Sequence, residues 1–412
     1  MSSELLDVDD ARARMLAAAH PLSLERVALT DLALDPRPRA LATVVHSRRA
    51  LPPFTNSAMD GYGVRSADVV AVGTQLRIVA QSLAGHGSST PIGAGEAVAI
   101  TTGAPIPAGV DAVVMREQCR AGEAAEGKVV IDHIPLVGEH VRPRGEDVAS
   151  GAVVGRVGDV VTPARLNLLL SAGHTSVEVV RRPIVAVLAS GDELREIGEA
   201  DGSDDNVIVN SNAWAIAAAA RAGGAEVRML GIAKDTLADH VARMDVDDVD
   251  VLVTIGGVSV GSHDFVRPAL VQLGATLHVW QIAMRPGKPL AFGSLSPQHR
   301  RRPVLVLGLP GNPVSALVTF TLFGLPLLHA LAGRQDVLPT TTTAILDDDQ
   351  PFLKKRGLRF FARARLTAGR LRLLERQGSG QMSGLADANA LACLPKDAER
   401  IEPGAVVDVI PL

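Results

Sequence analysis

Three segments of the chain carry residues that are suited to binding a phosphorylated ligand together with a metal ion. Each follows a run of apolar residues and contains glycine: "SGDEL" at 190–194, "GGVSVGSHD" at 256–264 and "GLPGNPVS" at 308–315. Glycine leaves backbone N–H groups exposed, so an anion can approach the main chain closely. The carboxylates of Asp192, Glu193 and Asp264 are ligands that Mg²⁺ prefers, and this ion often bridges a carboxylate to a phosphate.

A fourth segment, "MRPGKPLAFG", supplies two positive charges, Arg285 and Lys288, around a turn that contains proline. Taken singly, each segment has a plain structural explanation. A glycine loop can be a tight turn, acids can complement a helix dipole, and a lysine can simply face solvent. Ligands bind at the carboxyl ends of strands in open parallel sheets, and the four segments converge on one such edge. The convergence therefore favours a binding site.

The elements that must position these residues have the pattern of a doubly wound α/β domain. "RRPIVAVLAS", "VDVLVTIGG" and "RPVLVLGLPG" are continuous apolar runs of the parallel-strand type, and each ends in or next to glycine. The helical segments "NAWAIAAAARAGG" and "TLADHVARM" lie between them. This alternation predicts an α/β domain over residues 176–333.

The flanking regions have a different texture. The first 45 residues have helical spacing, and Thr162-Pro163 predicts a helix start that Gly173 ends. Residues 46–135 contain short apolar runs separated by glycine and proline, which predicts a β-rich unit. The last eighty or so residues return to short strands and turns, which predicts a small β-domain.

Composition excludes several classes of protein. The 412 residues are 47% hydrophobic and 21% charged, an ordinary globular balance. A net charge of −4 argues against a nucleic-acid binder, which would need a basic face. Two cysteines provide neither a disulfide framework nor a thiolate metal site. The acidic, mixed N-terminus is unlike a signal peptide, so we expect a soluble, cytoplasmic protein.

The apolar stretch 315–332 has nearly the length of a membrane span. It contains Gly324, Pro326 and His329, and it follows a strand and a glycine loop. We therefore predict a helix buried in the α/β core and no membrane association.

A second group of polar residues lies in "LPPFTNSAMDGYGVR", residues 51–65. On physical grounds alone this segment favours a local turn, in which Asn56 and Asp60 bond nearby backbone and Asp60-Gly61 turns a hairpin.

Seven motifs, in order, resemble those of the molybdopterin molybdotransferase family, which includes bacterial MoeA proteins, plant and animal homologues and the E domain of gephyrin. They are "PPFTNSAMDGYGVR", "TTGAPIPAGVDAVVMRE", "VRPRGEDV", "SGDEL", "GGVSVGSHDF", "RPGKPLAFG" and "GLPGNPVSALVTF". The match runs from about residue 20 to the C-terminus. The resemblance implies that molybdate is inserted into the dithiolene of adenylylated molybdopterin, with Mg²⁺ as cofactor and release of AMP.

The resemblance also implies an architecture and partners. The subunit would have four domains: 1–45 plus 136–175, an inserted β-rich domain at 46–135, the α/β domain at 176–333, and a β-barrel-like domain at 334–412. Two subunits would form an elongated homodimer, and each site would lie between the α/β domain of one subunit and the inserted domain of the other. A molybdopterin adenylyltransferase would act upstream.

Site residues follow by motif. The positions implied to be catalytic are Asp60, Thr102, Arg142, Asp147, Glu193, Asp235 and Asp264. Among these, Glu193 and Asp264 would hold the metal. The positions implied to bind substrate are Gly256, Gly257, Ser259, Gly261, Arg285, Lys288, Pro289, Pro310, Gly311, Asn312, Ser315, Arg363 and Ser383. The resemblance thus favours a functional role for Asp60 over the local turn.

The chain departs from the family pattern at three positions. Arg285 stands where a lysine is usual, Gln281 follows Trp280 where a lysine is common, and Ser190 replaces a threonine. Arginine keeps the charge and can bind an oxyanion through two N–H groups.

Two other functions fit the same features. One is a catalytically weak paralogue that binds molybdopterin or acts as a scaffold, and the other is an adenylyltransferase, which rests on fold analogy alone. The retained acidic residues favour the enzyme over the scaffold.

Overall fold

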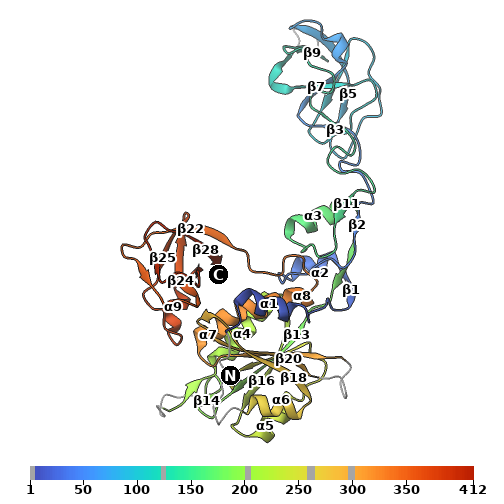
Figure 1. The fold of residues 1–412 in the computed structure, drawn as a ribbon. Helices are drawn as coiled ribbons and strands as arrows, with labels where there is room; N and C mark the ends of the chain where they lie inside the picture. Colours follow the sequence, from blue (N-terminus) through green and yellow to red (C-terminus); the bar gives the residue numbers. More distant parts are fainter. Residues whose placement is uncertain (1–4, 122–126, 200–205, 258–264, 296–301) are drawn as a thin grey trace. The chain divides into compact units, whose positions relative to one another are not determined.

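The computed structural model describes residues 5–121, 127–199, 206–257, 265–295 and 302–412 (Figure 1). The chain divides into two compact units. Unit 1 comprises residues 1–43, 157–162 and 178–412, and unit 2 comprises 44–156 and 163–177.

The central sheet of unit 1 has six strands in the order β16-β13-β17-β21-β20-β18. Four are parallel: β16 (Glu226–Ala233), β13 (Ile184–Ser190), β17 (Val251–Ile255) and β21 (Val304–Leu309). Two antiparallel strands follow at one edge, β20 (Pro289–Leu295) and β18 (Ala275–Gln281). The three strands predicted from apolar runs are therefore confirmed, and they are neighbours.

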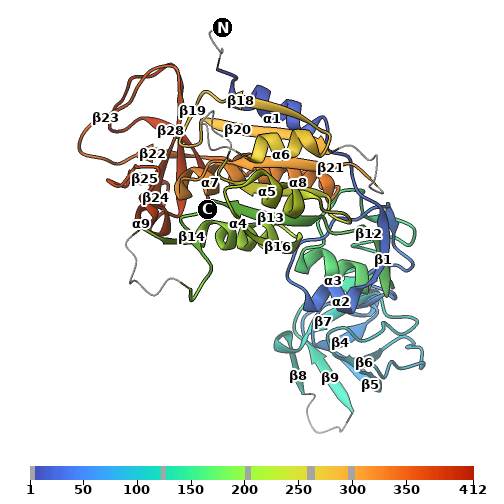
Figure 2. The same cartoon turned by 90° about the horizontal axis from the view of Figure 1, so that it is seen from below.

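Helices cover both faces of this sheet (Figures 1 and 2). One face carries α1 (Val8–Leu16), α4 (Ser211–Ala222), α7 (Pro313–Thr319) and α8 (Leu325–Leu331), and the other carries α5 (Leu237–Met244) and α6 (Val266–Gln272). Alternate residues of β13 enter the two cores, because side chains alternate along a strand. Val185 and Val187 enter the core with α1, α4, α7 and α8, whereas Ala186 and Leu188 enter the core with α5 and α6. The predicted doubly wound domain is confirmed.

The predicted core helix is also confirmed. Helix α7, a π-helical turn (η4, Phe320–Gly324) and α8 form one segment, Pro313–Leu331, and 72% of its apolar 18-residue stretch is buried. Within the described residues, this is the one helix that has the length and apolar composition to cross a membrane. A Cβ at Gly324 would lie 2.3 Å from the Phe320 ring, so the turn requires glycine there.

The C-terminal part of unit 1 forms a small closed barrel, as predicted. Its sheet has the order β19-β24-β25-β22-β28-β26, and a further pairing of β24 with β26 closes it. The elements are β19 (Met284–Arg285), β22 (Thr342–Leu346), β24 (Arg359–Thr367), β25 (Arg370–Leu373), α9 (Met382–Ala386), β26 (Ala390–Leu394) and β28 (Val406–Pro411), beside the pair β23 (Phe352–Leu353) and β27 (Arg400–Ile401).

Unit 2 is built on a six-stranded sheet in the order β7-β4-β6-β5-β9-β8. Its elements are β4 (Gly61–Val64), η1 (Ser66–Asp68), β5 (Thr74–Ser82), β6 (Glu96–Ile100), β7 (Ala112–Met115), η2 (Arg116–Gln118), β8 (Cys119–Ala121) and β9 (Lys128–Ile131). Two short pairs join it, β3 (Asn56–Ser57) with β10 (Val141–Arg142), and β2 (Val45–His46) with β11 (Val153–Gly155). Helix α3 (Pro163–Ser171) starts at the predicted proline. The four domain boundaries stay a prediction.

The N-terminal segment is less helical than its spacing predicts. After α1, strand β1 (Leu24–Ala28) pairs with β12 (Ser176–Val180), and only then does the short helix α2 (Leu29–Leu34) follow. A small parallel pair, β14 (Leu194–Arg195) with β15 (Ile208–Val209), was not predicted.

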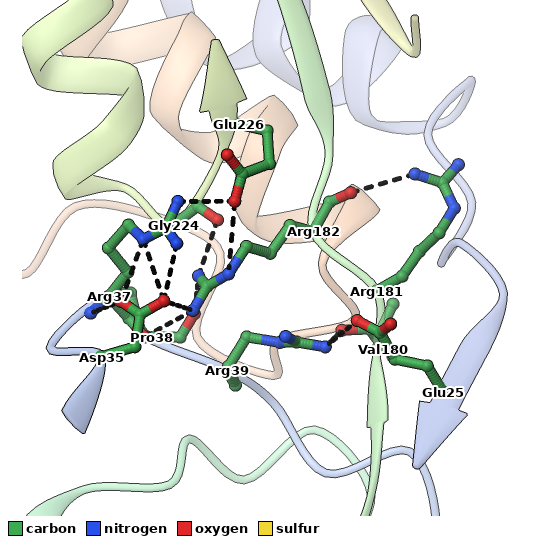
Figure 3. A network of polar contacts seen from close by, with 10 residues as sticks. All are labelled: Glu25, Asp35, Arg37, Pro38, Arg39, Val180, Arg181, Arg182, Gly224 and Glu226. Carbon is green, nitrogen blue, oxygen red and sulfur yellow. Dashed lines mark hydrogen bonds and ion pairs between the residues drawn. The ribbon is translucent and has the colours of Figure 1, made fainter. Parts of the chain in front are cut away.

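Ion pairs bind the N-terminal segment to the amino ends of the parallel strands (Figure 3). Arg37 contacts Asp35 at 2.6 Å and Glu226, the first residue of β16, at 2.6 Å. Arg182, just before β13, contacts Asp35 at 2.9 Å. These residues, with Arg39, Glu25, Arg181 and Asp250, form what we call the amino-end network.

Candidate functional site

A cavity of about 490 Å³ lies at the carboxyl end of the central sheet in unit 1. Its volume is typical of a small-molecule site. The walls come from the loops after β13, β16, β17 and β21, from β15 and from the start of α4: Ala189, Ser190, Gly191, Glu193, Leu194, Ile208, Val209, Asn210, Ser211, Asn212, Asp235, Ile255, Gly256, Gly257, Gly311 and Pro313. Five predicted site residues therefore line one cavity, namely Glu193, Asp235, Gly256, Gly257 and Gly311.

Reciprocal hydrogen bonds join two of the loops. The N–H of Asp235 donates to Oδ1 of Asp192 at 3.1 Å, and the N–H of Asp192 donates to Oδ2 of Asp235 at 3.4 Å. The loops after β13 and β16 thus hold two carboxylates near each other. Glu193 is exposed and makes no ion pair with any described residue. Accumulated negative charge of this kind favours a cation.

Glycine is required at several points of the wall. A Cβ at Gly191 would lie 2.3 Å from Oε2 of Glu193, and its φ of +147° favours glycine. Gly256 and Gly257 have φ of +87° and +63°. A Cβ at Gly311 would lie 3.6 Å from the Cα of Gly256, so the two loops run side by side. Asn212 fixes this arrangement, because its Nδ2 donates to the carbonyl of Gly311 at 2.7 Å.

Three predicted residues of the glycine loop, Ser259, Gly261 and Asp264, lie outside the described residues. Pro310 and Asn312 flank Gly311, directly before α7. In the part of the chain that the structure describes, no group of three His, Cys, Asp or Glu side chains is placed to hold a metal ion. Carboxylate oxygens of Glu193 and Asp235 nevertheless fit Mg²⁺, which is commonly held by one or two carboxylates plus substrate phosphates.

Arg285, Lys288 and Arg363, which we call the cation group, belong to the segment before β20 and to strand β24. Arg285 lies in β19 with its Cζ 5.4 Å from the centre of the Phe360 ring. Arg285 and Lys288 are exposed, and neither makes an ion pair among the described residues. The turn between them packs tightly, since a Cβ at Gly287 would lie 2.2 Å from Oγ1 of Thr319. Pro289 begins β20 directly after Lys288.

Arg363 is the largest fully buried side chain of the described residues. Its Nε and Nη2 donate to the carbonyl of Arg376 at 2.8 and 2.5 Å, and Nη2 also donates to the carbonyl of Gly378 at 3.2 Å. Its Nη1 is buried and has no hydrogen-bond partner in the part of the chain that the structure describes. Burial lowers the pKa of Arg363, and the positive charge of Arg285 nearby adds to this effect. A buried cation without a carboxylate is unusual, because burying a charge without a counter-charge is costly.

Helix α7, which like the cation group belongs to unit 1, carries two residues with side-chain hydroxyl groups. Ser315 is 4% exposed, and Oγ1 of Thr319 is buried with no described residue as a hydrogen-bond partner. Ser383 lies in α9, and its Oγ accepts a hydrogen bond from Nη1 of Arg376 at 2.7 Å. Arg376 was missed by sequence reasoning, because it lies in no motif and meets Arg363 only through the fold.

In unit 2, the structure brings Asp60 and Thr102 together. The N–H of Thr102 donates to Oδ1 of Asp60 at 2.6 Å, and the hydrogen bonds from the Thr102 backbone and side chain hold the pKa of Asp60 below its usual value. The partner of Asp60 is thus 42 residues away in sequence. Strand β3 pairs with β10, while β4 pairs with β6 and β7, so the prediction that Asp60-Gly61 turns a hairpin is wrong. The prediction that Asn56 bonds nearby backbone is confirmed, because its Nδ2 donates to the carbonyl of Phe54 at 3.2 Å.

Arg142 and Asp147 flank the same segment. Arg142 is in register with Asn56, and the N–H of Asp147 donates to the carbonyl of Leu51 at 3.0 Å. Both side chains are exposed. All four site residues predicted in unit 2 therefore lie within or directly beside the segment 51–61. A Cβ at Gly61 would lie 1.9 Å from the Val114 carbonyl oxygen, so glycine is required where β4 meets β7.

Three family models match the chain. They are the MoeA N-terminal region (domain I and II) at residues 6–173, a probable molybdopterin binding domain at 186–330, and the MoeA C-terminal region (domain IV) at 349–412.

Curated relatives and solved structures match over nearly the whole chain. A molybdopterin molybdenumtransferase of Nostoc is 34% identical and covers 91% of this chain and 86% of its own. One of Bacillus subtilis is 33% identical and covers 98% and 94%. A crystal structure of a molybdopterin biosynthesis MoeA protein from Pyrococcus horikoshii is 26% identical, with a TM-score of 0.76 over 99% of both chains.

Proposed function

The chain belongs to the MoeA family of molybdopterin molybdenumtransferases, and from this premise we propose that it is a transferase that inserts molybdate into adenylylated molybdopterin. The reaction would release AMP and form the molybdenum cofactor. We assign molybdate and adenylylated molybdopterin as substrates and Mg²⁺ as the cofactor.

The observation that carries the proposal is the cation group without carboxylate partners. Molybdate is a dianion, and the nucleotide adds phosphoryl charges that repel it. Arg285 and Lys288 make no ion pair among the described residues, and Nη1 of buried Arg363 has no partner. Charge-assisted hydrogen bonds from such groups would offset the repulsion between the two anions. A scaffold would have no need of this costly arrangement.

The cavity would bind the phosphate-bearing part of the other substrate. Its glycine loops present backbone N–H groups to an anion, and their positive φ angles maintain that shape. Glu193 and Asp235 would hold Mg²⁺ together with Asp264. The ion would supply charge neutralisation at the phosphoanhydride. The protein's own contribution is to orient both anions and to keep their charges screened.

A thiol nucleophile has no support. Burial raises the pKa of Cys119 to about 11 and that of Cys393 to about 12, so very little thiolate forms at neutral pH. Neither cysteine lines the cavity.

The test is AMP release from adenylylated molybdopterin, measured with and without molybdate and with and without Mg²⁺. We expect release to require both. AMP that appears at the same rate without molybdate would replace the insertase with a hydrolase. Binding of the nucleotide without any turnover would favour the scaffold.

We further propose that the protein acts as a cytoplasmic homodimer, downstream of a molybdopterin adenylyltransferase. In this arrangement Asp60 of one subunit would complete the site that contains Glu193 of the other. The support is that the Asp60 carboxylate is exposed and held ionised by Thr102 at the surface of unit 2.

Mixed dimers test this arrangement. Pure Asp60→Ala and pure Glu193→Ala dimers should each lose activity by about 10²-fold or more, because each lacks a charge in every site. Random pairing makes about half the dimers mixed, and in each of these one site has both defects and the other has neither. Activity should therefore recover to about one quarter of wild type. Mixed dimers that stay inactive would exclude a site shared between subunits. An active Asp60→Ala dimer would show that Asp60 is not part of the site.

A further inference from the structure

Ser190 is linked to a buried histidine at the edge of the cavity. It is the last residue of β13, and it lines the cavity wall. Its Oγ lies 2.8 Å from Nε2 of His240, and Nδ1 of His240 lies 2.9 Å from the carbonyl oxygen of Thr236. His240 is fully buried in α5. None of these residues was singled out by the family motifs, apart from the replacement at Ser190.

The hydrogen-bond directions follow from the donor inventory. A carbonyl oxygen only accepts, so Nδ1 of His240 must carry the hydrogen in its bond to Thr236. In the neutral imidazole Nε2 is then an acceptor. With the imidazole neutral, the hydroxyl of Ser190 therefore donates its one hydrogen to Nε2 of His240. Oγ is left with lone pairs alone to offer to a ligand.

The surroundings keep His240 in this orientation. Thr236 caps α5, since its Oγ1 accepts from the N–H of Asp239 at 3.3 Å. The Phe265 ring lies 5.8 Å from the imidazole, tilted by 40°. The rigid imidazole can thus act as a positioning group for the Ser190 hydroxyl.

A second acceptor lies on the same wall. Asn210 is 1% exposed, and its Nδ2 donates to Oε1 of Glu196 at 3.2 Å. Because a carboxylate only accepts, this bond determines which end of the amide is the oxygen. The opposite atom, Oδ1, is buried without a hydrogen-bond partner among the described residues, although Asn210 lines the cavity. An unpaired buried acceptor of this kind calls for a donor.

We infer that Ser190 and Asn210 recognise hydrogen-bond donors of the bound nucleotide, and that His240 is the positioning residue that makes Ser190 an acceptor. The inference rests on the proposed function, and it places in this cavity the adenylyl group of the nucleotide substrate as well as its phosphates. The donors of that group are the ribose hydroxyls and the exocyclic amine of the base. A phosphate oxygen cannot serve, because it only accepts.

Calorimetric titration of full-length protein with nucleoside monophosphates tests the inference. The reference ligand is AMP, and 2′-deoxy-AMP, 3′-deoxy-AMP and purine riboside 5′-monophosphate each lack one of its donors. Ser190→Ala should weaken AMP binding about 2- to 12-fold, the range of one neutral hydrogen bond. Ser190→Thr should bind like wild type, because it keeps the hydroxyl. The matched control is Ser294→Ala in β20, half-buried and opposite the start of β21 at the other end of the sheet.

The decisive result is non-additivity. Wild type should bind one analogue more weakly than it binds AMP. Ser190→Ala should bind that analogue and AMP equally tightly, because this variant lacks the hydroxyl that the missing donor would contact. That analogue identifies the donor as a ribose hydroxyl or the base amine. His240→Leu alone should weaken AMP binding by less than Ser190→Ala does. Added to Ser190→Ala, it should not weaken AMP binding further.

Two results would overturn the inference while leaving the proposed function intact. In one, Ser190→Ala binds AMP as wild type does. In the other, it binds all four ligands more weakly by the same factor, as a merely loosened loop would. A third result, wild type that binds none of them, would remove the proposed function and the inference together.

Discussion

The two ends of the central sheet differ in whether their charged side chains are paired. At the amino ends of β13 and β16, charged side chains of the amino-end network contact an opposite charge (Figure 3). At the amino end of β17, Asp250 contacts Arg181. At the carboxyl end, Glu193 lines the cavity, and neither it nor Arg285 makes an ion pair with another described residue. Both ends belong to one sheet, so the difference lies in the side chains that the loops supply.

The contrast distinguishes residues that stabilise the protein from residues that are available to bind a ligand. Asp250, 3% exposed, accepts from Nη1 and Nη2 of Arg181 at 2.8 and 2.6 Å and from the N–H of Ile184 at 2.8 Å, and it forms an ion pair with Nε of Arg302 at 3.2 Å. Both oxygens of this carboxylate are therefore bonded within the protein. Charges left unpaired at the opposite end contribute nothing comparable to stability, which indicates that they are retained for function.

The largest effect that we expect is on stability at the amino end. Asp250→Ala leaves Arg181 without its buried partner, and breaking a buried pair costs about 3–5 kcal/mol. Chemical denaturation should show this loss in the free energy of unfolding, while the molybdate concentration for half-maximal AMP release stays unchanged. Asp248→Asn is the control, since Asp248 is exposed with a φ of +57° that asparagine tolerates. A stable Asp250→Ala protein would refute the proposed role of the network.

The second effect concerns acid. The helix from Pro313 to Leu331 follows β21 and therefore returns toward the amino end of the sheet, where it carries His329. Burial, with repulsion from Arg334, lowers the pKa of His329 to about 4. The unfolded chain binds a proton near pH 6.5, whereas the folded chain does not, so stability is complete above pH 6.5 and falls between pH 6.5 and 4.

The expected loss over that window is about 3 kcal/mol. Unfolding at fixed pH values should show it, and His329→Gln should remove most of the slope between pH 6.5 and 4. In the amino-end network, hydrogen bonds from Arg37 hold the pKa of Asp35 below its usual value. Its contribution is therefore present above the unfolded value of 3.8 and is lost only at lower pH. A slope that survives in His329→Gln would assign the acid sensitivity elsewhere.

Sequence predicted best what depends on local periodicity. The apolar runs identified β13, β17 and β21, and helical spacing identified α4 and α5, because core-facing residues repeat within each element. Glycine loops at strand ends also identified the cavity, since parallel strands present their carboxyl ends at one edge.

Contacts between distant residues could not be predicted in this way. Ser190 and His240 are 50 residues apart, and Asp60 and Thr102 are 42 apart. No pattern in one sequence shows that such pairs meet, because the meeting depends on how loops cross after the sheet has formed. The bond between Arg376 and Ser383 is closer in sequence, but its importance follows only from the burial of Arg363.

The smallest of the three effects is the most informative about the carboxyl end. Arg285→Ala should raise the molybdate concentration for half-maximal AMP release by about 10- to 150-fold, since a charge-assisted oxyanion contact contributes about 1.5–3 kcal/mol. Stability should fall by less than about 1 kcal/mol, because Arg285 is exposed and loses only its contact with the Phe360 ring. Arg285→Lys keeps the charge and should remain active. This pattern is the reverse of that expected for Asp250→Ala, so the two variants together test the contrast between the ends. If Arg285→Ala binds molybdate normally, the oxyanion is held elsewhere, and the unpaired charge of Arg285 is only a solvated surface charge.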